Sequence, residues 1–431
     1  MGRDFTEAPP GHRFGLYFNA WDRKDFTLIE DGKRDALREL IPVASYSRDL
    51  TDAVRQRQVR LARTVASSIL HLPARSTSPF VTGTGIEHPL ENGFAFLNPY
   101  GLPYLSGSSI KGVVRRAAEE LAFGLWGDRR GWDIASVWWL FGFEGVSAYL
   151  TGATAGMTAR IVREEAEGWR ERLRVAVRAG QFDPKLVTAF VDKATDAETK
   201  AKYVGDPAHF LETLAEEHQP GPRSHRLLRE TIQFRGALCF WDALIAPAGD
   251  TLAVDVLTPH FGDYYQEGQS PADCGQPGPS FFLAVPPGSR FDFFVQAGEG
   301  RLPSELSLRW QGLMEQAFQL AFDWLGFGAK SAVGYGRMER DPERAARDGA
   351  REPRGRRSGV QALEARIASM RSEEFKPQAD ALRRDLDGCE EHERGRLLDA
   401  IEARLRHFGW RPREVNDMMA RLRRSSRGEG A

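Results

Sequence analysis

A glycine-rich stretch near residue 330 has the residue types that suit contact with an anionic ligand. Between Gly326 and Arg337, twelve residues contain four glycines, one lysine and one arginine. Glycine tolerates a positive φ angle and lets a backbone approach a ligand closely. Backbone N–H groups in such a loop, together with Lys330 and Arg337, suit a phosphate-bearing partner. We expect an ordered functional loop, because a flexible linker would not carry Phe327 and Tyr335 among its glycines.

A second stretch, Gly107–Lys111, predicts an anion site at the start of a helix. Ser108 or Ser109 is a good N-cap. Apolar residues follow at the spacing of one helix face, at Ile110, Val113, Val114, Ala117, Ala118 and Leu121. Lys111 and Arg115 take the other side of this helix. Free backbone N–H groups, two hydroxyls and a lysine at a helix start favour an anion.

Neither stretch fits a nucleotide-binding motif. A P-loop requires G-x-x-x-x-G-K-[ST], and the order and spacing of residues 107–112 differ from it. The glycine pairs at 326/328 and 334/336 superficially match a dinucleotide fingerprint. That fingerprint lies after a strand and before a helix, whereas these glycines follow a helical pattern and precede a strand.

Two histidines, His88 and His260, lie in loop-like sequence and are candidates for acid–base catalysis. Structural hydrogen bonding or stacking is the simpler interpretation of each. Residues 258–265 hold three aromatic rings, a histidine and an aspartate; they either pack on a neighbour or stack nucleobases. No HExxH motif, G-x-S-x-G motif or spacing diagnostic of a metal site is present, and we expect no metal and no cofactor.

The composition is that of an ordinary globular protein. The formal net charge is −1, so any anion-binding surface must arise from a local arrangement of charge. The three cysteines form no CxxC pair, and Cys239, in an apolar run, is expected to be a buried small hydrophobe. We expect a cytoplasmic protein, because the N-terminus lacks a signal-peptide pattern and no window is long and apolar enough for a membrane span.

The pattern along the chain predicts an α+β fold with an antiparallel sheet. The expected organisation is an N-terminal arm and helical segment over 1–75, a core over 76–340 with a mainly helical insertion at about 124–230, an arginine-rich linker over 341–359 and a helical extension over 360–425. Residues 1–15 are expected to be frayed or ordered by a partner, and helix is predicted from about 31 to 72. The expected strands of the core's second half are 232–243, 252–257, 281–285, 291–295 and 334–339, with a helix over 306–325.

The helical pattern that precedes residue 72 carries a series of arginines. Arg55, Arg57, Arg60 and Arg63 alternate with apolar residues. The simpler interpretation is a solvated helix face. The other interpretation is a strip that faces RNA or a protein partner.

Three separated motifs point to one family. Leu102–Arg115 resembles the P-G-S-S-[IL]-K-G-x-x-R signature of RAMP proteins, the repeat-associated RNA-binding proteins of CRISPR systems, and Gly326–Arg337 resembles their carboxy-terminal glycine-rich loop. Residues 258–265, followed by Phe282–Val285, resemble a segment typical of the sixth RAMP subunit of the type III-B (Cmr) effector complex. The resemblance covers roughly residues 75–340. The insertion and the helical extension lie outside the family pattern.

The resemblance implies ferredoxin-like (RRM-type) units, two of them fused. It implies a non-catalytic structural subunit that binds CRISPR RNA toward its 3′ end and caps the filament of backbone subunits, where target RNA is cut by the backbone subunit. The implied partners are CRISPR RNA, target RNA, the backbone and small Cmr subunits and a neighbouring RAMP subunit, and no membrane. The RNA-binding candidates are Ser108, Ser109, Lys111, Arg115, His260, Gly328, Lys330, Ser331, Gly334 and Arg337. The helix start and the glycine loop would then form a bipartite cradle for the RNA backbone.

Two other functions stay open. The first is a RAMP endoribonuclease that processes CRISPR repeat RNA by metal-independent acid–base cleavage, with His88 or His260 as the acid or base. The second is a purely protein-binding role without RNA contact.

Overall fold

The structure is a computed structural model of the 431-residue chain. It describes residues 5–22, 24–29, 32–65, 68–88, 92–153, 159–216, 227–257, 279–344, 367, 370, 372, 375–387 and 391–423. His260 and the rest of the 258–265 motif lie outside the described residues, as does most of the expected linker. The chain divides into two compact units, Met1–Pro342 and Glu343–Ala431. Each unit has a hydrophobic core of its own.

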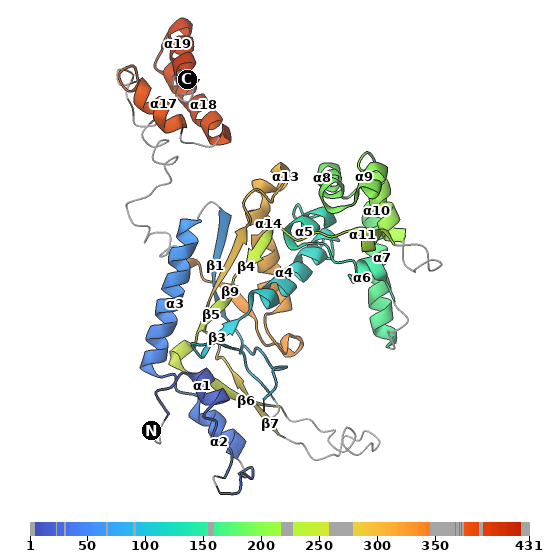
Figure 1. The fold of residues 1–431 in the computed structure, drawn as a ribbon, viewed down its shortest axis with the longest axis vertical. Helices are drawn as coiled ribbons and strands as arrows, with labels where there is room; N and C mark the ends of the chain where they lie inside the picture. Colours follow the sequence, from blue (N-terminus) through green and yellow to red (C-terminus); the bar gives the residue numbers. More distant parts are fainter. Residues whose placement is uncertain are drawn as a thin grey trace. The chain divides into compact units, whose positions relative to one another are not determined.

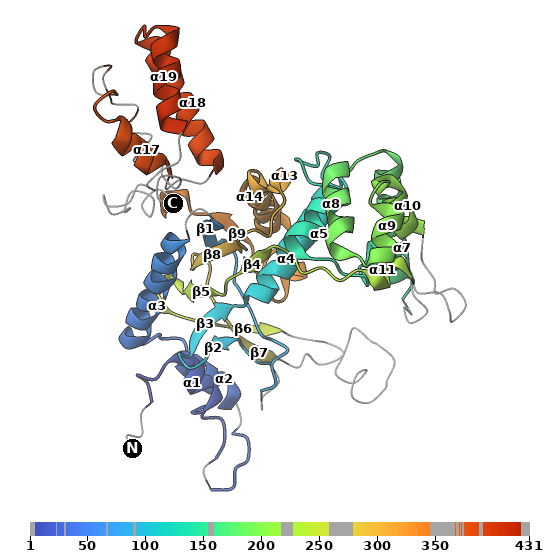
Figure 2. The same ribbon diagram turned by 45° about the horizontal axis from the view of Figure 1, so that its top comes forward.

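An antiparallel sheet of seven strands forms the centre of the first unit (Figure 1). Its strand order is β2-β3-β5-β8-β1-β9, and β4 pairs with β8. Helix α3 covers one face of the sheet, and α4 and α14 cover the other (Figures 1 and 2). The expected α+β class is thereby confirmed. The strands are β1 (Ile69–Ser76), β2 (Phe96–Leu97), β3 (Leu102–Leu105), β4 (Leu238–Phe240), β5 (Ala243–Ala246), β8 (Arg290–Ala297) and β9 (Met338–Arg340), with β6 (Ala253–Leu257) and β7 (Ser280–Ala284) as a separate pair.

Strand β8 is buried on both faces, which explains its nearly continuous apolar sequence. On one face, the ring of Phe293 lies 5.4 Å from that of Phe318 in α14 (Trp310–Leu320). On the other face, Phe294 packs toward α3 (Ser45–Thr64). Asp292 also points to this face, where Arg55 donates to its Oδ2 from Nε at 2.9 Å and from Nη2 at 2.8 Å. A buried ion pair therefore ties α3 to the centre of the sheet.

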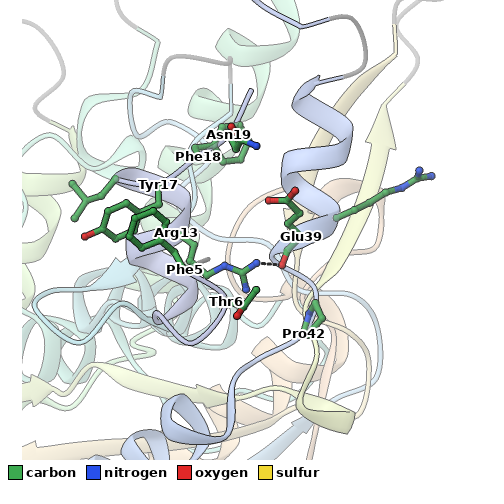
Figure 3. A pocket seen from close by; sticks show the side chains of 10 residues that line it. Phe5, Thr6, Arg13, Tyr17, Phe18, Asn19, Glu39 and Pro42 are labelled. Carbon is green, nitrogen blue, oxygen red and sulfur yellow. Dashed lines mark hydrogen bonds between the residues drawn. The ribbon is translucent and has the colours of Figure 1, made fainter. Parts of the chain in front are cut away.

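The N-terminal segment is ordered from residue 5, in contrast to the frayed arm that the sequence suggested. Helix α1 (Pro10–Gly15) buries Phe14, whose ring stacks on His88 at 4.1 Å. This apolar contact holds the segment against the rest of the unit. Residues of this segment and of α2 (Gly32–Glu39) line an open cavity of about 620 Å³ (Figure 3). The Arg13 side chain donates to the backbone oxygen of Glu39 beside that cavity.

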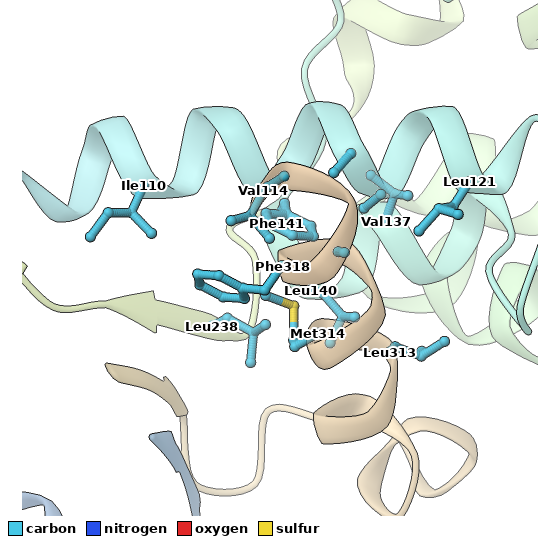
Figure 4. Close-up of a cluster of buried hydrophobic side chains, with 14 of the residues drawn as sticks. Ile110, Val114, Leu121, Val137, Leu140, Phe141, Leu238, Leu313, Met314 and Phe318 are labelled. Atoms are coloured by element: carbon cyan, nitrogen blue, oxygen red, sulfur yellow. The ribbon is translucent and has the colours of Figure 1, made fainter. Parts of the chain in front are cut away.

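Helix α4 (Gly107–Ala122) packs on α14 through the apolar face that the sequence predicted (Figure 4). Ile110, Val114 and Leu121 are fully buried there. Phe141 of the next helix joins the same cluster. The predicted helix over 306–325 is two helices, α13 (Ser304–Ser307) and α14, followed by the π-helical turn η3 (Ala321–Leu325).

The described part of residues 124–230 is mainly helical. Its elements are α5 (Ile134–Phe141), α6 (Ala148–Thr151), α7 (Arg160–Arg178), α8 (Pro184–Ala194), α9 (Ala197–Tyr203), α10 (Pro207–Glu216) and α11 (Leu228–Thr231). A β-bridge joins Gly142, which follows α5, to Arg235, which follows α11. Trp132, Trp138 and Trp139 are buried in its core.

Several predicted elements need correction. Helix α3 ends at Thr64, and residues 69–76 are a central strand instead of the end of that helix. The strand expected over 232–243 is shorter, because only 238–240 pair with β8. Cys239 is exposed and not buried. The alternation of side chains along β4 turns Leu238 inward and Cys239 outward.

The second unit contains three helices in its described part: α17 (Ala379–Asp387), α18 (Glu391–His407) and α19 (Pro412–Arg423). Phe375, Leu382, Ile401 and Met419 are among the side chains of its core. In the described parts of both units, no helix combines the length and apolar character needed to cross a membrane.

Candidate nucleic-acid interface

The start of α4 is shaped by residues that lie on both sides of it in the sequence. Ser106, rather than Ser108 or Ser109, is the N-cap, and its Oγ accepts from the Ser109 amide at 3.2 Å. Gly107 lies so close to strand β4 that a Cβ there would be 2.1 Å from the Phe240 carbonyl oxygen. The hydroxyls of Ser108 and Ser109 are exposed and lie 3.0 and 2.8 Å from Ser106 Oγ. Polar donors therefore gather on the open side of the helix start.

Asp242 anchors this helix start to the β4–β5 bend. Its Oδ1 accepts from the Gly107 amide at 2.8 Å. Its backbone oxygen accepts from Gln58 Nε2 of α3 at 3.0 Å. The helix start, the bend and α3 are thus joined through one residue, which the sequence offered no local signal to identify.

Lys111 is the cation that this helix start offers to a ligand. The side chain is half-buried, and it has no ion-pair partner among the residues that the structure describes. Burial lowers the pKa of Lys111, and the positive charges of Arg115 and Arg235 lower it further. An anion bound beside Lys111 would favour its charged form and so raise its pKa again. Arg235, which is exposed and 124 positions away in the sequence, was not among the predicted residues.

Arg115 does not face outward as the sequence suggested. It is 7% exposed. Its Nε donates to Glu119 at 2.8 Å, and its Nη1 lies 3.5 Å from Glu144 of the insertion. Tyr149, whose pKa is raised to about 12 chiefly by burial, lies beside the same guanidinium. Because the insertion covers this side of α4, Arg115 serves the junction between the two and is not available to RNA.

The glycine-rich loop needs its glycines to pack on its own chain. Gly326, Gly328, Gly334 and Gly336 all have φ between 73° and 97°. The Phe327 amide donates to the Gly336 carbonyl at 2.9 Å. The Ala329 and Gly336 amides donate to the Val81 and Pro79 carbonyls, at 2.7 and 2.8 Å. These amides are not available to a phosphate, so the cradle of free N–H groups expected from the sequence is not formed by this part of the loop.

Two glycine variants distinguish the two reasons for glycine in this loop, a positive φ angle and a close approach to another backbone segment. Gly336→Ala places a Cβ 1.8 Å from the Phe327 carbonyl oxygen at a φ of 74°, whereas Gly334→Ala meets open space at a φ of 97°. Gly334→Ala should cost about 1–2 kcal/mol of stability from backbone strain alone. Gly336→Ala should cost more, since the backbone must also move apart. Chemical denaturation measures both, and equal losses would contradict the close approach at Gly336.

The cations of the loop have different surroundings. Lys330 has a φ of 61°, and its Nζ lies 4.8 Å from the centre of the Phe282 ring. Arg337 donates a side-chain hydrogen bond to the backbone oxygen of Asp323. Tyr335 donates to Asp255 at 2.5 Å. Ser331 is half-buried, in a short 3₁₀ turn (η4, Ser331–Val333), and Gly328 is exposed. Among the described residues, the Arg337 side chain is hydrogen-bonded to a backbone oxygen, whereas the Lys330 side chain makes no such bond.

The two predicted halves of the cradle lie in different surroundings. Trp324, which leads into the glycine loop, is 58% exposed and its ring lies 5.2 Å from that of Trp126. Trp126 follows the end of α4 opposite to Lys111. A helix of 16 residues separates these ends by about 24 Å. In the described part of the chain, no hydrogen bond or ion pair joins residues 107–111 to residues 326–337, so direct contact does not make them one site.

His88 has a packing role in the structure. Besides its stack on Phe14, its ring meets that of Phe18 edge-on at 5.2 Å, and its Nε2 lies 3.3 Å from the Phe14 carbonyl oxygen. Burial lowers the pKa of His88. Within the described residues, no group of three or more histidines, cysteines or carboxylates is placed to hold a metal ion.

Comparison with known proteins shows a similarity to one family. Residues 74–248 match the family model described as the RAMP superfamily. The similarity to RAMP proteins covers this part of the chain. The matched RAMP segment contains the helix start at 107–111 and Arg235, and it ends before the glycine loop.

Individual relatives extend the comparison. The CRISPR system Cmr subunit Cmr6 of Pyrococcus furiosus is 26% identical over 283 residues, which cover 61% of this chain and 66% of the relative, just under two thirds of its length. A crystal structure of Cmr6 from Pyrococcus furiosus aligns with 63% of this chain and 98% of its own, at 23% identity and a TM-score of 0.25. A cryo-electron-microscopy structure of the type III-B Cmr-beta complex bound to cognate target RNA contains a chain that aligns with 72% of this one and 70% of its own, at 15% identity and a TM-score of 0.37.

Proposed function

We propose that this protein is a non-catalytic subunit of a type III-B (Cmr) CRISPR effector complex that binds CRISPR RNA. The proposal rests on the match of residues 74–248 to the RAMP superfamily and on the similarity to a Cmr6 protein. Its partners would be CRISPR RNA, target RNA and the other Cmr subunits, in the cytoplasm. Its position would be the end of the backbone filament, near the 3′ end of the CRISPR RNA.

One structural observation carries the RNA-binding part of the proposal. Lys111 sits half-buried at a helix start, and the charges of Arg115 and Arg235 act on it together with the opposing charge of Glu144, although no carboxylate in the described part of the chain is close enough to form an ion pair with it. The exposed Ser108 and Ser109 hydroxyls add hydrogen-bonding groups beside it, whereas the Gly107 and Ser109 amides are already bonded to Asp242 and Ser106. A phosphate of the RNA backbone would bind Lys111 and these hydroxyls together.

Processing of repeat RNA by this chain is the alternative. It is less well supported, because the His88 ring is used in aromatic packing. Purified protein and repeat–spacer RNA in EDTA distinguish the two functions. We expect binding without cleavage; sequence-selective cleavage that is lost in His260→Ala would instead establish the nuclease.

Purification of the complex from its native cells tests the assembly. We expect a tagged chain to co-purify with the other Cmr subunits and with RNA whose sequence consists of CRISPR repeat and spacer. Crosslinking should place this chain near the 3′ end of that RNA. Crosslinks confined to the 5′ end would refute the proposed position, and RNA without CRISPR sequence would refute the function.

A further inference from the structure

Helix α3 presents a regular row of arginines on the face turned away from the sheet. Arg57, Arg60 and Arg63 recur every three residues and are all exposed. The opposite face of the helix is buried and includes Arg55 and Ala62. The three exposed guanidinium groups therefore form one strip, which we call the α3 arginine strip.

The α3 arginine strip differs from the other arginines of its helix in lacking acidic partners. Arg48 pairs with Asp250 at 2.9 Å, and Arg55 pairs with the buried Asp292. Within the described residues, no ion pair involves Arg57, Arg60 or Arg63. Arg60 Nε donates only to the helix carbonyl of Gln56, at 3.3 Å. Three like charges on adjacent turns repel one another, and an anionic partner would relieve that repulsion.

The local sequence increases this imbalance of charge. From Ala53 to Ile86, 34 consecutive residues contain no aspartate or glutamate. Acidic residues number 60 in 431, so a stretch of this length would ordinarily hold about five. A helix face that only meets water does not require the absence of aspartate and glutamate, because exposed helices usually carry charges of both signs. Within α3 the acid-free part is Ala53–Thr64, which contains all three arginines of the strip.

We propose that the α3 arginine strip is a second contact surface for the RNA backbone, separate from the start of α4. This inference rests on the proposed RNA-binding function. Guanidinium groups bind phosphate oxygens in a bidentate manner and remain charged at any physiological pH. Contacts from the strip to phosphate oxygens carry no sequence information. A contact between α3 and the α4 start through Asp242 gives the two surfaces a common rigid support.

The test compares two triple variants of equal charge change in the full-length chain. One is Arg57→Gln/Arg60→Gln/Arg63→Gln. The control is Arg160→Gln/Arg340→Gln/Arg406→Gln, in which each arginine is exposed and already paired, with Glu164, Glu315 and Glu402 respectively. Binding of a fluorescent single-stranded RNA is measured from 0.05 to about 0.3 M salt, over which phosphate contacts dominate affinity.

We expect the strip variant to bind at least about tenfold more weakly at low salt and to lose about two from the slope of log K against log salt. The control should stay near the parent protein in both. Equal losses in the two variants would show a nonspecific effect of net charge and overturn the proposal. An unchanged strip variant would overturn it while leaving the RNA-binding function intact. Retained RNA binding with loss of a Cmr subunit in co-purification would assign the strip to a protein partner instead. A parent protein that binds no RNA would remove both proposals.

Discussion

Asp292→Ala should lower the free energy of unfolding by up to about 3 kcal/mol, because it leaves the buried Arg55 with only the exposed Asp52, 3.2 Å from its Nη1, as a counter-charge. Asp292 is 1% exposed and Arg55 is 8% exposed. The carboxylate also accepts from His71 Nε2 at Oδ1, 2.9 Å away, while the imidazole stacks on Phe294 at 4.3 Å. Loss of Asp292 therefore removes two hydrogen bonds that join α3 to the sheet and one that joins β1 to β8 within the sheet.

Urea denaturation measures this effect, with Arg48→Ala as the control. Arg48 belongs to the same helix and pairs with Asp250, but both side chains are about half exposed. Its removal should cost less than about 1 kcal/mol. A small loss in both variants would mean that the buried network does not stabilise the docking of α3.

The stability difference between the parent protein and Asp292→Asn should depend on pH. Burial raises the pKa of Asp292, but the hydrogen bonds from His71 and Arg55 and their charges outweigh it, so that the pKa lies below its ordinary value. A lowered pKa contributes stability that is fully present above the unfolded-state value of about 4. That contribution is lost as the pH falls through the folded-state pKa. The difference between the two proteins should be full at pH 7 and shrink only in strong acid.

Lys111→Glu should weaken RNA binding at least about tenfold at low salt, since it replaces the cation at the α4 start by a charge that repels phosphate. Lys111→Arg keeps the charge and should bind nearly as well as the parent protein. Fluorescence anisotropy with single-stranded RNA measures both. If Lys111→Glu bound like the parent protein, the α4 start would not be an RNA contact.

The parent protein and Lys111→Arg should differ in how their RNA affinity depends on pH in alkaline solution. Burial and the neighbouring arginine charges lower the pKa of Lys111, so its charge is lost at a lower pH than that of an ordinary lysine. RNA affinity of the parent protein should therefore decline as the pH rises toward that pKa. Lys111→Arg should show no such decline, because a guanidinium stays protonated. Parallel pH profiles would contradict the role of the Lys111 amine.

The apolar face of α4 could be predicted because helix spacing is a local property. Ile110, Val114 and Leu121 are buried as their spacing predicted. The cap was wrong because three serines near the helix start can all accept from a backbone amide. Contact of Gly107 with the distant Phe240 and Asp242 selects Ser106, and such a contact has no signature in the local sequence.

Strand β1 was missed because its residues are poor indicators of a central strand. Pro73 lacks a backbone N–H, and proline usually argues against a strand interior. Here Pro73 is opposite Asp292 in β8, and its carbonyl accepts from the Asp341 amide at 2.9 Å. The pairing partners follow more than 200 residues later. Long-range pairing thus overrides the local preference.

The candidate site could be predicted in its residue types but not in its exposure. Lys111 is half-buried, whereas Arg115, one turn later, is enclosed by Glu144 and Tyr149 of the insertion. In the glycine loop, the spacing indicated an ordered segment, but it did not reveal that Gly328 and Gly336 approach other backbone segments. Exposure depends on which distant segment covers a residue, and a single sequence does not contain that information.

The bridge between Gly142 and Arg235 has a consequence for how this protein can vary. The Phe143 amide donates to the Phe234 carbonyl at 3.1 Å, so the chain departs and rejoins the core through two adjacent backbones. A Cβ on Gly236 would lie 2.3 Å from the Phe141 carbonyl carbon. Only glycine therefore lets the two backbone segments run this close together. Loop closure depends only weakly on the length of chain between fixed ends. The chain between these two crossings can therefore lengthen or shorten at its surface turns during evolution, whereas the parts that cover Arg115 and pack on α5 must be kept.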